Sequence, residues 1–121
     1  MQSCASANYF AQTNFTDGRI IIKKTEFVTE NKKVHRKFVL VRSEKYNYPI
    51  CIYKTGKENY SALLMLCTHN GCELQPHGDF LLCPCHGSEF TNKGVVQNPP
   101  ADQNLKTFSI VTDDENVYVQ L

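Results

Sequence analysis

Short runs of apolar residues, separated by polar turn residues, make up most of the chain from residue 19 onward. β-branched and aromatic residues are enriched in these runs, and Gly, Asn and Asp collect between them, as in strands joined by turns. The alternation of Val117, Tyr118 and Val119 is typical of a strand with one buried face. The runs predict strands over residues 19–27, 37–42, 49–53, 61–67, 80–83, 105–111 and 116–121.

Helical periodicity is nearly absent from the sequence. No window of 11–18 residues keeps the apolar repeat of a helix, and residues 25–33 form the only weak helical candidate. The succession of short apolar runs and turns predicts a small all-β domain of antiparallel strands, built as a sandwich or a partly open barrel. Residues 1–18 are small and polar and end in Asp17-Gly18, so we expect an N-terminal arm or tether before a domain over residues 19–121.

The overall composition is that of an ordinary soluble domain. The chain has 121 residues, which predicts one domain with a single modest core. Its formal net charge is +1, so electrostatics gives no reason to expect a nucleic-acid partner. No apolar run approaches the roughly 18–20 residues of a membrane span. The first ten residues also lack the basic and apolar regions of a signal peptide.

Two short boxes concentrate the residues that carry chemistry. The first box, residues 67–72, reads CTHNGC, and the second box, residues 83–88, reads CPCHGS. Together they hold four of the six cysteines and two of the four histidines. Such clustering points to a site and not to a disulfide scaffold for the whole fold.

Read as C-x-H and C-x-x-H, each box can supply one cysteine and one histidine to a site from a short loop at the end of a strand. A zinc finger uses the same ligand types, but with two cysteines in one half and two histidines in the other. Mixed halves suit a pair of metals with different ligands, as in a [2Fe–2S] cluster with two cysteines on one iron and two histidines on the other. A structural zinc module is the alternative. The candidate ligands are Cys67, His69, Cys83 and His86.

The sequences CTHNGC and CPCHGSEF closely resemble the paired motif of Rieske iron–sulfur proteins. Gly94, the Pro99-Pro100-Ala101 loop and the strand rhythm resemble the same family more loosely over about residues 19–121. The resemblance implies one [2Fe–2S] cluster per chain, held by the four candidate ligands, and a disulfide between Cys72 and Cys85. It also implies a Rieske fold with a cluster-binding subdomain at one tip, formed by loops at about residues 66–101.

The ligand set predicts a relatively high reduction potential. Two thiolates and two neutral imidazoles leave the oxidised site uncharged, so an electron is added more easily than with four thiolates. Rieske centres lie at about −150 to +300 mV, against about −400 mV for plant-type ferredoxins. Ser88 matches the family serine that donates to a bridging sulfide. Phe90 stands where respiratory members usually carry a tyrosine that donates to a ligating sulfur, so we expect an intermediate to high potential.

The resemblance implies an electron-transfer subunit of a membrane-associated respiratory oxidoreductase, which is not catalytic alone. Its partners would be a cytochrome, a quinol-oxidising membrane subunit, or both. The alternatives are a Rieske ferredoxin that serves an oxygenase and the small subunit of an arsenite-oxidase-like complex. Asn70 weakens the quinol assignment, because quinol-oxidising complexes usually place an apolar residue there.

The expected disulfide also bears on location. A Cys72–Cys85 bridge persists in an oxidising compartment, so we expect the periplasm or the outer side of a bacterial membrane. Cys4 lies in a stretch that resembles the start of a mature bacterial lipoprotein, and its lipidation would tether the domain to a membrane. Cys51, in the apolar run PICIY, is expected to be a small buried hydrophobe.

Overall fold

The computed structural model of the chain describes residues 8–29, 31 and 34–121. Within this part of the chain there are twelve strands and one short 3-10 helix, η1. The elements are β1 Thr13–Thr16, β2 Arg19–Lys23, η1 Lys24–Phe27, β3 Phe38–Val41, β4 Ile50–Lys54, β5 Tyr60–Leu64, β6 Gln75–His77, β7 Phe80–Leu82, β8 Glu89–Thr91, β9 Val96–Asn98, β10 Thr107–Phe108, β11 Ile110–Thr112 and β12 Asn116–Gln120.

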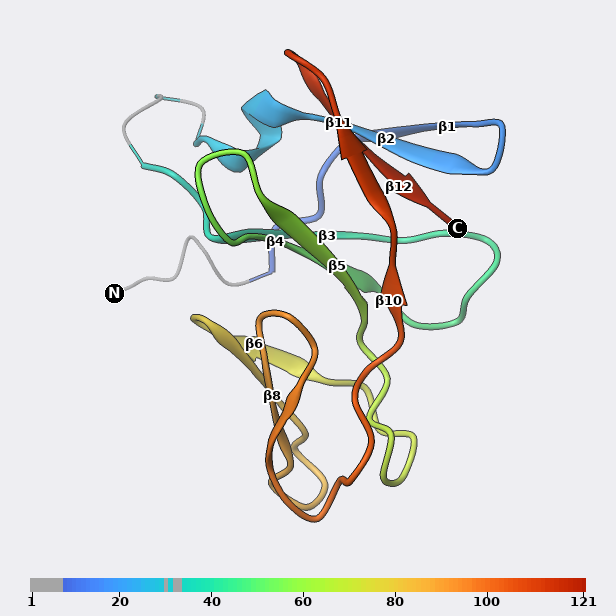
Figure 1. Cartoon of the computed structure of the whole chain (residues 1–121), viewed down its shortest axis with the longest axis vertical. Coiled ribbons are helices and arrows are strands. Elements are labelled where there is room, and N and C mark those ends of the chain that lie inside the picture. The colour runs from blue at the N-terminus through green and yellow to red at the C-terminus, as the bar shows by residue number, and fades with distance from the viewer. Residues whose placement is uncertain (1–7, 30, 32–33) are drawn as a thin grey trace.

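The strands form three antiparallel sheets of four strands each, in the orders β1-β2-β12-β11, β10-β5-β4-β3 and β6-β7-β8-β9. Figure 1 shows the third sheet at one end of the long axis, below the other two. We call the first two sheets the base. The third sheet, the two boxes and the proline loop (residues 99–104) are called the cluster-binding subdomain. The prediction of an antiparallel all-β fold is confirmed.

The middle sheet, β10-β5-β4-β3, is covered on both faces. Every residue of β3 is buried, and so are the first four residues of β4. Alternate side chains of these strands enter two different apolar cores. One core lies between the two sheets of the base, and the other continues into the cluster-binding subdomain. The uninterrupted apolar runs in these strands follow from burial on both faces.

Several local predictions need correction. Residues 13–16 belong to the expected irregular arm but form the edge strand β1, which pairs with β2. The expected strand at 105–111 is divided, because Thr107–Phe108 pairs with β5 in the middle sheet while Ile110–Thr112 pairs with β12 in the first. Among the described residues of the weak helical candidate at 25–33, the helical ones belong to η1. Strands β6, β8 and β9 were not expected from the sequence, because their residues QPH, EFT and VQN form no apolar run.

Hydroxyl groups of the base hold the cluster-binding subdomain by its backbone. The Tyr53 hydroxyl lies 2.8 Å from the carbonyl oxygen of Gly78 and 3.1 Å from that of Phe80. Burial raises the pKa of this hydroxyl, so it stays protonated as a donor. Ser61 donates in the same way to the carbonyl oxygen of Asn92. These contacts attach the subdomain to the base at the β6–β7 turn and at the residue after β8.

Candidate metal centre

The first box is a closed turn that begins directly after the middle sheet. The N–H of Cys67 donates to the carbonyl oxygen of Cys72 at 2.9 Å, and the N–H of Gly71 donates back to that of Cys67 at 2.9 Å. Gly71 has φ of 78°, a left-handed conformation that side chains rarely adopt. The glycine is therefore required for a turn that brings the two cysteines of the box together.

The second box repeats the same backbone pattern. The N–H of Cys83 donates to the carbonyl oxygen of Ser88 at 2.8 Å, and that of Gly87 donates to the carbonyl oxygen of Cys83 at 3.0 Å. Gly87 also has a positive φ, of 85°. Two six-residue turns with matching hydrogen bonds thus carry the candidate ligands.

A disulfide joins the two boxes. It links Cys72 to Cys85, whose Cα atoms are 6.5 Å apart. This confirms the pairing that the family resemblance implied. The bond fixes the separation of the two boxes.

The structure brings the candidate ligands together as two pairs, Cys67 with Cys83 and His69 with His86. Cys67 and Cys83 are 2% and 1% exposed and belong to the same apolar core. His69 and His86 are exposed, and their rings lie 5.3 Å apart between centroids at an angle of 84°. The site therefore offers two buried thiols and, beside them, two imidazoles at the surface.

Backbone groups of the second box are directed at the Cys83 sulfur. Burial and the neighbouring Cys67 thiol raise the pKa of Cys83, while hydrogen bonds from the N–H groups of Cys85 and His86 lower it. Such N–H groups stabilise negative charge on the sulfur. A metal that binds the thiolate would find these donors already in place.

The donor set fits a [2Fe–2S] cluster. Three sulfurs, those of Cys72, Cys83 and Cys85, lie within 4.8 Å of one another, but two of them are consumed in the disulfide. The free cysteines among the described residues are Cys51, Cys67 and Cys83. Two free thiols and two imidazoles at the boxes match the mixed ligand requirement of a Rieske cluster.

The proline loop is fastened to both boxes. The Ser88 hydroxyl oxygen accepts the N–H of Ala101 at 3.0 Å, and Ser88 is completely buried. The Thr68 hydroxyl donates to the carbonyl oxygen of Gln103 at 2.7 Å. Because its oxygen accepts from Ala101, the Ser88 hydroxyl keeps its own hydrogen for another acceptor. The sequence had singled out Ser88 but not its backbone partner.

Two further positions depart from the usual family residues. Phe90 is completely buried in the apolar core that contains Cys67 and Cys83, and it pairs with Leu81 across β7 and β8. Asn70 is exposed, and its Nδ2 lies 2.6 Å from Nδ1 of His86. The amide of Asn70 therefore makes the surface between the boxes polar, as its sequence position indicated.

The other two cysteines, Cys51 and Cys4, do not belong to the boxes. Cys51 is completely buried on β4, which agrees with a small hydrophobe, and burial raises its pKa well above the usual value. Cys4, the possible lipidation site, lies outside the described residues. Sequence reasoning missed Tyr48, whose hydroxyl donates to the carbonyl oxygen of Gly71. No motif marks it, because the contact joins residues 23 positions apart.

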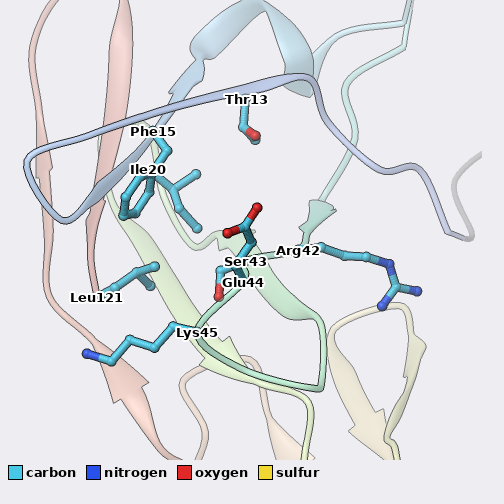
Figure 2. A pocket seen from close by; sticks show the side chains of 8 residues that line it. All are labelled: Thr13, Phe15, Ile20, Arg42, Ser43, Glu44, Lys45 and Leu121. Atoms are coloured by element: carbon cyan, nitrogen blue, oxygen red, sulfur yellow. The ribbon is translucent and has the colours of Figure 1, made fainter.

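A hollow of about 520 Å³ lies in the base, beside the β1–β2 hairpin and the loop after β3. Figure 2 shows Phe15, Ile20 and Leu121 on one side of it, with the carboxylate of Glu44 near the middle and Arg42 extending away. None of its lining residues belongs to either box. The metal centre is thus independent of this hollow.

An all-β fold with two Cys/His boxes that are joined by a disulfide is typical of an iron–sulfur electron-transfer protein. The family model of the Rieske [2Fe-2S] domain matches residues 20–109, and the chain belongs to this family. The cofactor of the family is the [2Fe–2S] cluster that the sequence predicted.

A curated relative is the ubiquinol-cytochrome c reductase iron-sulfur subunit of Rickettsia typhi, which is 40% identical over 55 residues. The match covers 43% of this chain and 31% of the relative, so the chain spans about a third of that protein. No helix among the described residues is long and apolar enough to cross a membrane.

Two solved structures are similar over most of the fold. The plasma membrane Rieske protein PetC3 of Synechocystis PCC 6803 is 30% identical with a TM-score of 0.62, covering 70% of this chain and 87% of that one. A ferredoxin and oxygenase complex of carbazole 1,9a-dioxygenase has 25% identity and a TM-score of 0.56, covering 69% and 80%. Both a membrane-associated Rieske protein and an oxygenase system are thus structural neighbours.

Removal of the disulfide should destabilise the protein. In the double variant Cys72→Ala/Cys85→Ala, the loop between these cysteines, whose sequence separation is 13, is no longer closed in the unfolded chain. We expect the free energy of unfolding in urea to fall by about 3 kcal/mol. Dithiothreitol should lower the stability of the wild type but leave that of the double variant unchanged. Equal stabilities under oxidising conditions would contradict the prediction.

Proposed function

We propose that the cluster is held by Cys67, His69, Cys83 and His86. In this proposal the chain is the electron-carrying subunit of a membrane-associated respiratory oxidoreductase, taking electrons from quinol and passing them to a cytochrome. The observation that carries the proposal is the disulfide between the boxes, which soluble Rieske ferredoxins generally lack. The relative named as a ubiquinol-cytochrome c reductase subunit supports the same assignment.

The residues around the boxes suit one-electron chemistry. When bound, a Rieske cluster accepts and releases one electron at a time. The N–H groups of Cys85 and His86 point at the Cys83 sulfur and favour the added negative charge. Ser88 presents a buried hydroxyl hydrogen at the second box, and this donor likewise favours added negative charge. The exposed imidazoles of His69 and His86 provide the side from which a partner would approach.

The proposed location is the periplasm or the outer side of a bacterial membrane. The Cys72–Cys85 bridge supports it, because such bonds persist in oxidising compartments. A membrane tether through a lipidated Cys4 remains part of the proposal. The structural neighbour named as a plasma membrane protein is consistent with membrane association.

A second candidate function is a Rieske ferredoxin that serves an oxygenase. The similarity to the carbazole dioxygenase complex favours it. The polar Asn70 also suits it better than a quinol site. The disulfide argues in the opposite direction, so this candidate ranks second. The small subunit of an arsenite-oxidase-like complex, which can keep the disulfide, stays a hypothesis from the sequence.

Substitution of a proposed ligand should abolish cluster binding. We expect Cys67→Ala to lose its bound iron and the EPR signal of the reduced protein, whose average g value should lie below that of an all-cysteine cluster. Cys51→Ala is the matched control, because Cys51 is a second free cysteine buried in the same apolar core. It should keep iron and signal. Iron retained in Cys67→Ala would refute the ligand assignment.

The midpoint potential separates the two candidate functions. A carrier between quinol and a cytochrome should lie in the upper half of the Rieske range of about −150 to +300 mV. We expect protein-film voltammetry of the loaded chain to give such a value. A midpoint near the lower end of the range would instead favour the ferredoxin assignment.

Phe90→Tyr should raise the midpoint potential. A tyrosine hydroxyl at this buried position can donate to a ligating sulfur, and a hydrogen bond to a charged group is worth about 1.5 kcal/mol. For one electron, this corresponds to roughly 60 mV. Phe108→Tyr adds a hydroxyl in the other core and should leave the midpoint unchanged. If voltammetry finds no shift for Phe90→Tyr, residue 90 does not tune the site.

A further inference from the structure

A tyrosine of the base reaches the first box from outside the cluster-binding subdomain. Tyr48 lies in the loop between β3 and β4, and its hydroxyl donates to the carbonyl oxygen of Gly71 at 3.0 Å. Its half-buried ring packs against the apolar core between the two sheets of the base. The aromatic ring therefore anchors the side chain while the hydroxyl reaches the box.

The accepting carbonyl belongs to the peptide that links Gly71 to Cys72. The N–H at the other end of this peptide lies 3.3 Å from Oδ1 of Asn70, and the same oxygen lies 3.7 Å from the sulfur of Cys83. The N–H therefore points to the side of the first box on which Cys83 lies. A hydroxyl that donates to the carbonyl polarises the peptide and makes its N–H a stronger donor.

We propose that Tyr48 is a positioning residue that stabilises the reduced state of the iron–sulfur site through the Gly71–Cys72 peptide. The inference rests on the proposed ligand set, because it requires Cys83 to bind the cluster in front of this N–H. The hydrogen bond holds the peptide in place and strengthens its dipole, and both effects favour added negative charge nearby.

Because of Tyr48, the two boxes are held by hydrogen bonds from different parts of the fold. The second box is held within the cluster-binding subdomain, where Ser88 accepts the N–H of Ala101. The first box is held by Thr68 from within and by Tyr48 from the base. A conformational change in the loop between β3 and β4 would thus be transmitted to the first box through the hydroxyl group of Tyr48.

Tyr48→Phe tests the proposal, since it removes the hydroxyl and keeps the ring. In the full chain loaded with its cluster, we expect unchanged iron content and a retained Rieske EPR signal. The equilibrium constant for reduction should fall about threefold, which is roughly 28 mV at 59 mV per tenfold. Hydrogen exchange measured by mass spectrometry should become faster in fragments that contain residues 67–72.

Two matched variants separate this role from a general loss of stability. Tyr46→Phe alters a tyrosine of the same loop whose ring packs on Phe108, and it should change neither potential nor exchange. Tyr53→Phe removes a hydroxyl that holds the subdomain at Gly78, so it should lower stability without moving the midpoint.

An unchanged midpoint in a loaded Tyr48→Phe variant would overturn the proposal, as would an equal shift in Tyr53→Phe. Failure of the ligand set is recognised separately, because iron would then remain in Cys67→Ala, and the proposal for Tyr48 would fall with it. A shifted midpoint together with iron loss in Cys67→Ala supports both.

Discussion

Burial of the middle sheet on both faces is the constraint on which the rest of the structure depends. Leu40 and Cys51 point into the core that continues to the boxes, whereas Val39 and Ile50 point into the core of the base. A slip of one residue in the pairing would exchange these faces. Cys67 lies three residues beyond the end of β5. Its position in the core that continues to the boxes therefore follows from the register of that strand.

The boxes add a second constraint, which is local. Each turn closes on itself through the same pair of backbone hydrogen bonds, and the disulfide then fixes one turn against the other. Donors that are already oriented need no rearrangement when charge arrives, which is the general advantage of a preorganised polar site. The proline loop contributes to this rigidity because it is bonded to Thr68 in one box and to Ser88 in the other.

The chemistry of the site could be predicted from the sequence because its signals are local. Two six-residue boxes contain the candidate ligands and the disulfide cysteines, so the family resemblance was sufficient to predict the cofactor and the disulfide. The strands of the base were also visible, since burial on both faces leaves long apolar runs. The edge strand at 13–16 was missed, because all four of its residues are exposed and it has no apolar pattern.

Contacts between distant segments could not be predicted in this way. The donation from Ala101 to Ser88 and that from Tyr48 to Gly71 each join residues without a shared motif. Residues 105–111 read as one strand, yet they cross from one sheet to another after Phe108. Hydrophobic pattern alone does not distinguish these cases, because both halves of the run are apolar and the partner strands lie far away in the sequence.

The surface near the boxes bears on which kind of partner fits. The two boxes, residues 67–72 and 83–88, contain no Asp, Glu, Lys or Arg, and the proline loop contains one charged residue, Asp102. A freely diffusing carrier gains association rate from charges that steer it toward its partner. A subunit held in a complex does not need such steering, because tethering already raises the effective concentration of the partner. In the proposed subunit of an assembly, the uncharged boxes, with the exposed imidazoles and the Asn70 amide between them, would be recognised by shape and hydrogen bonding.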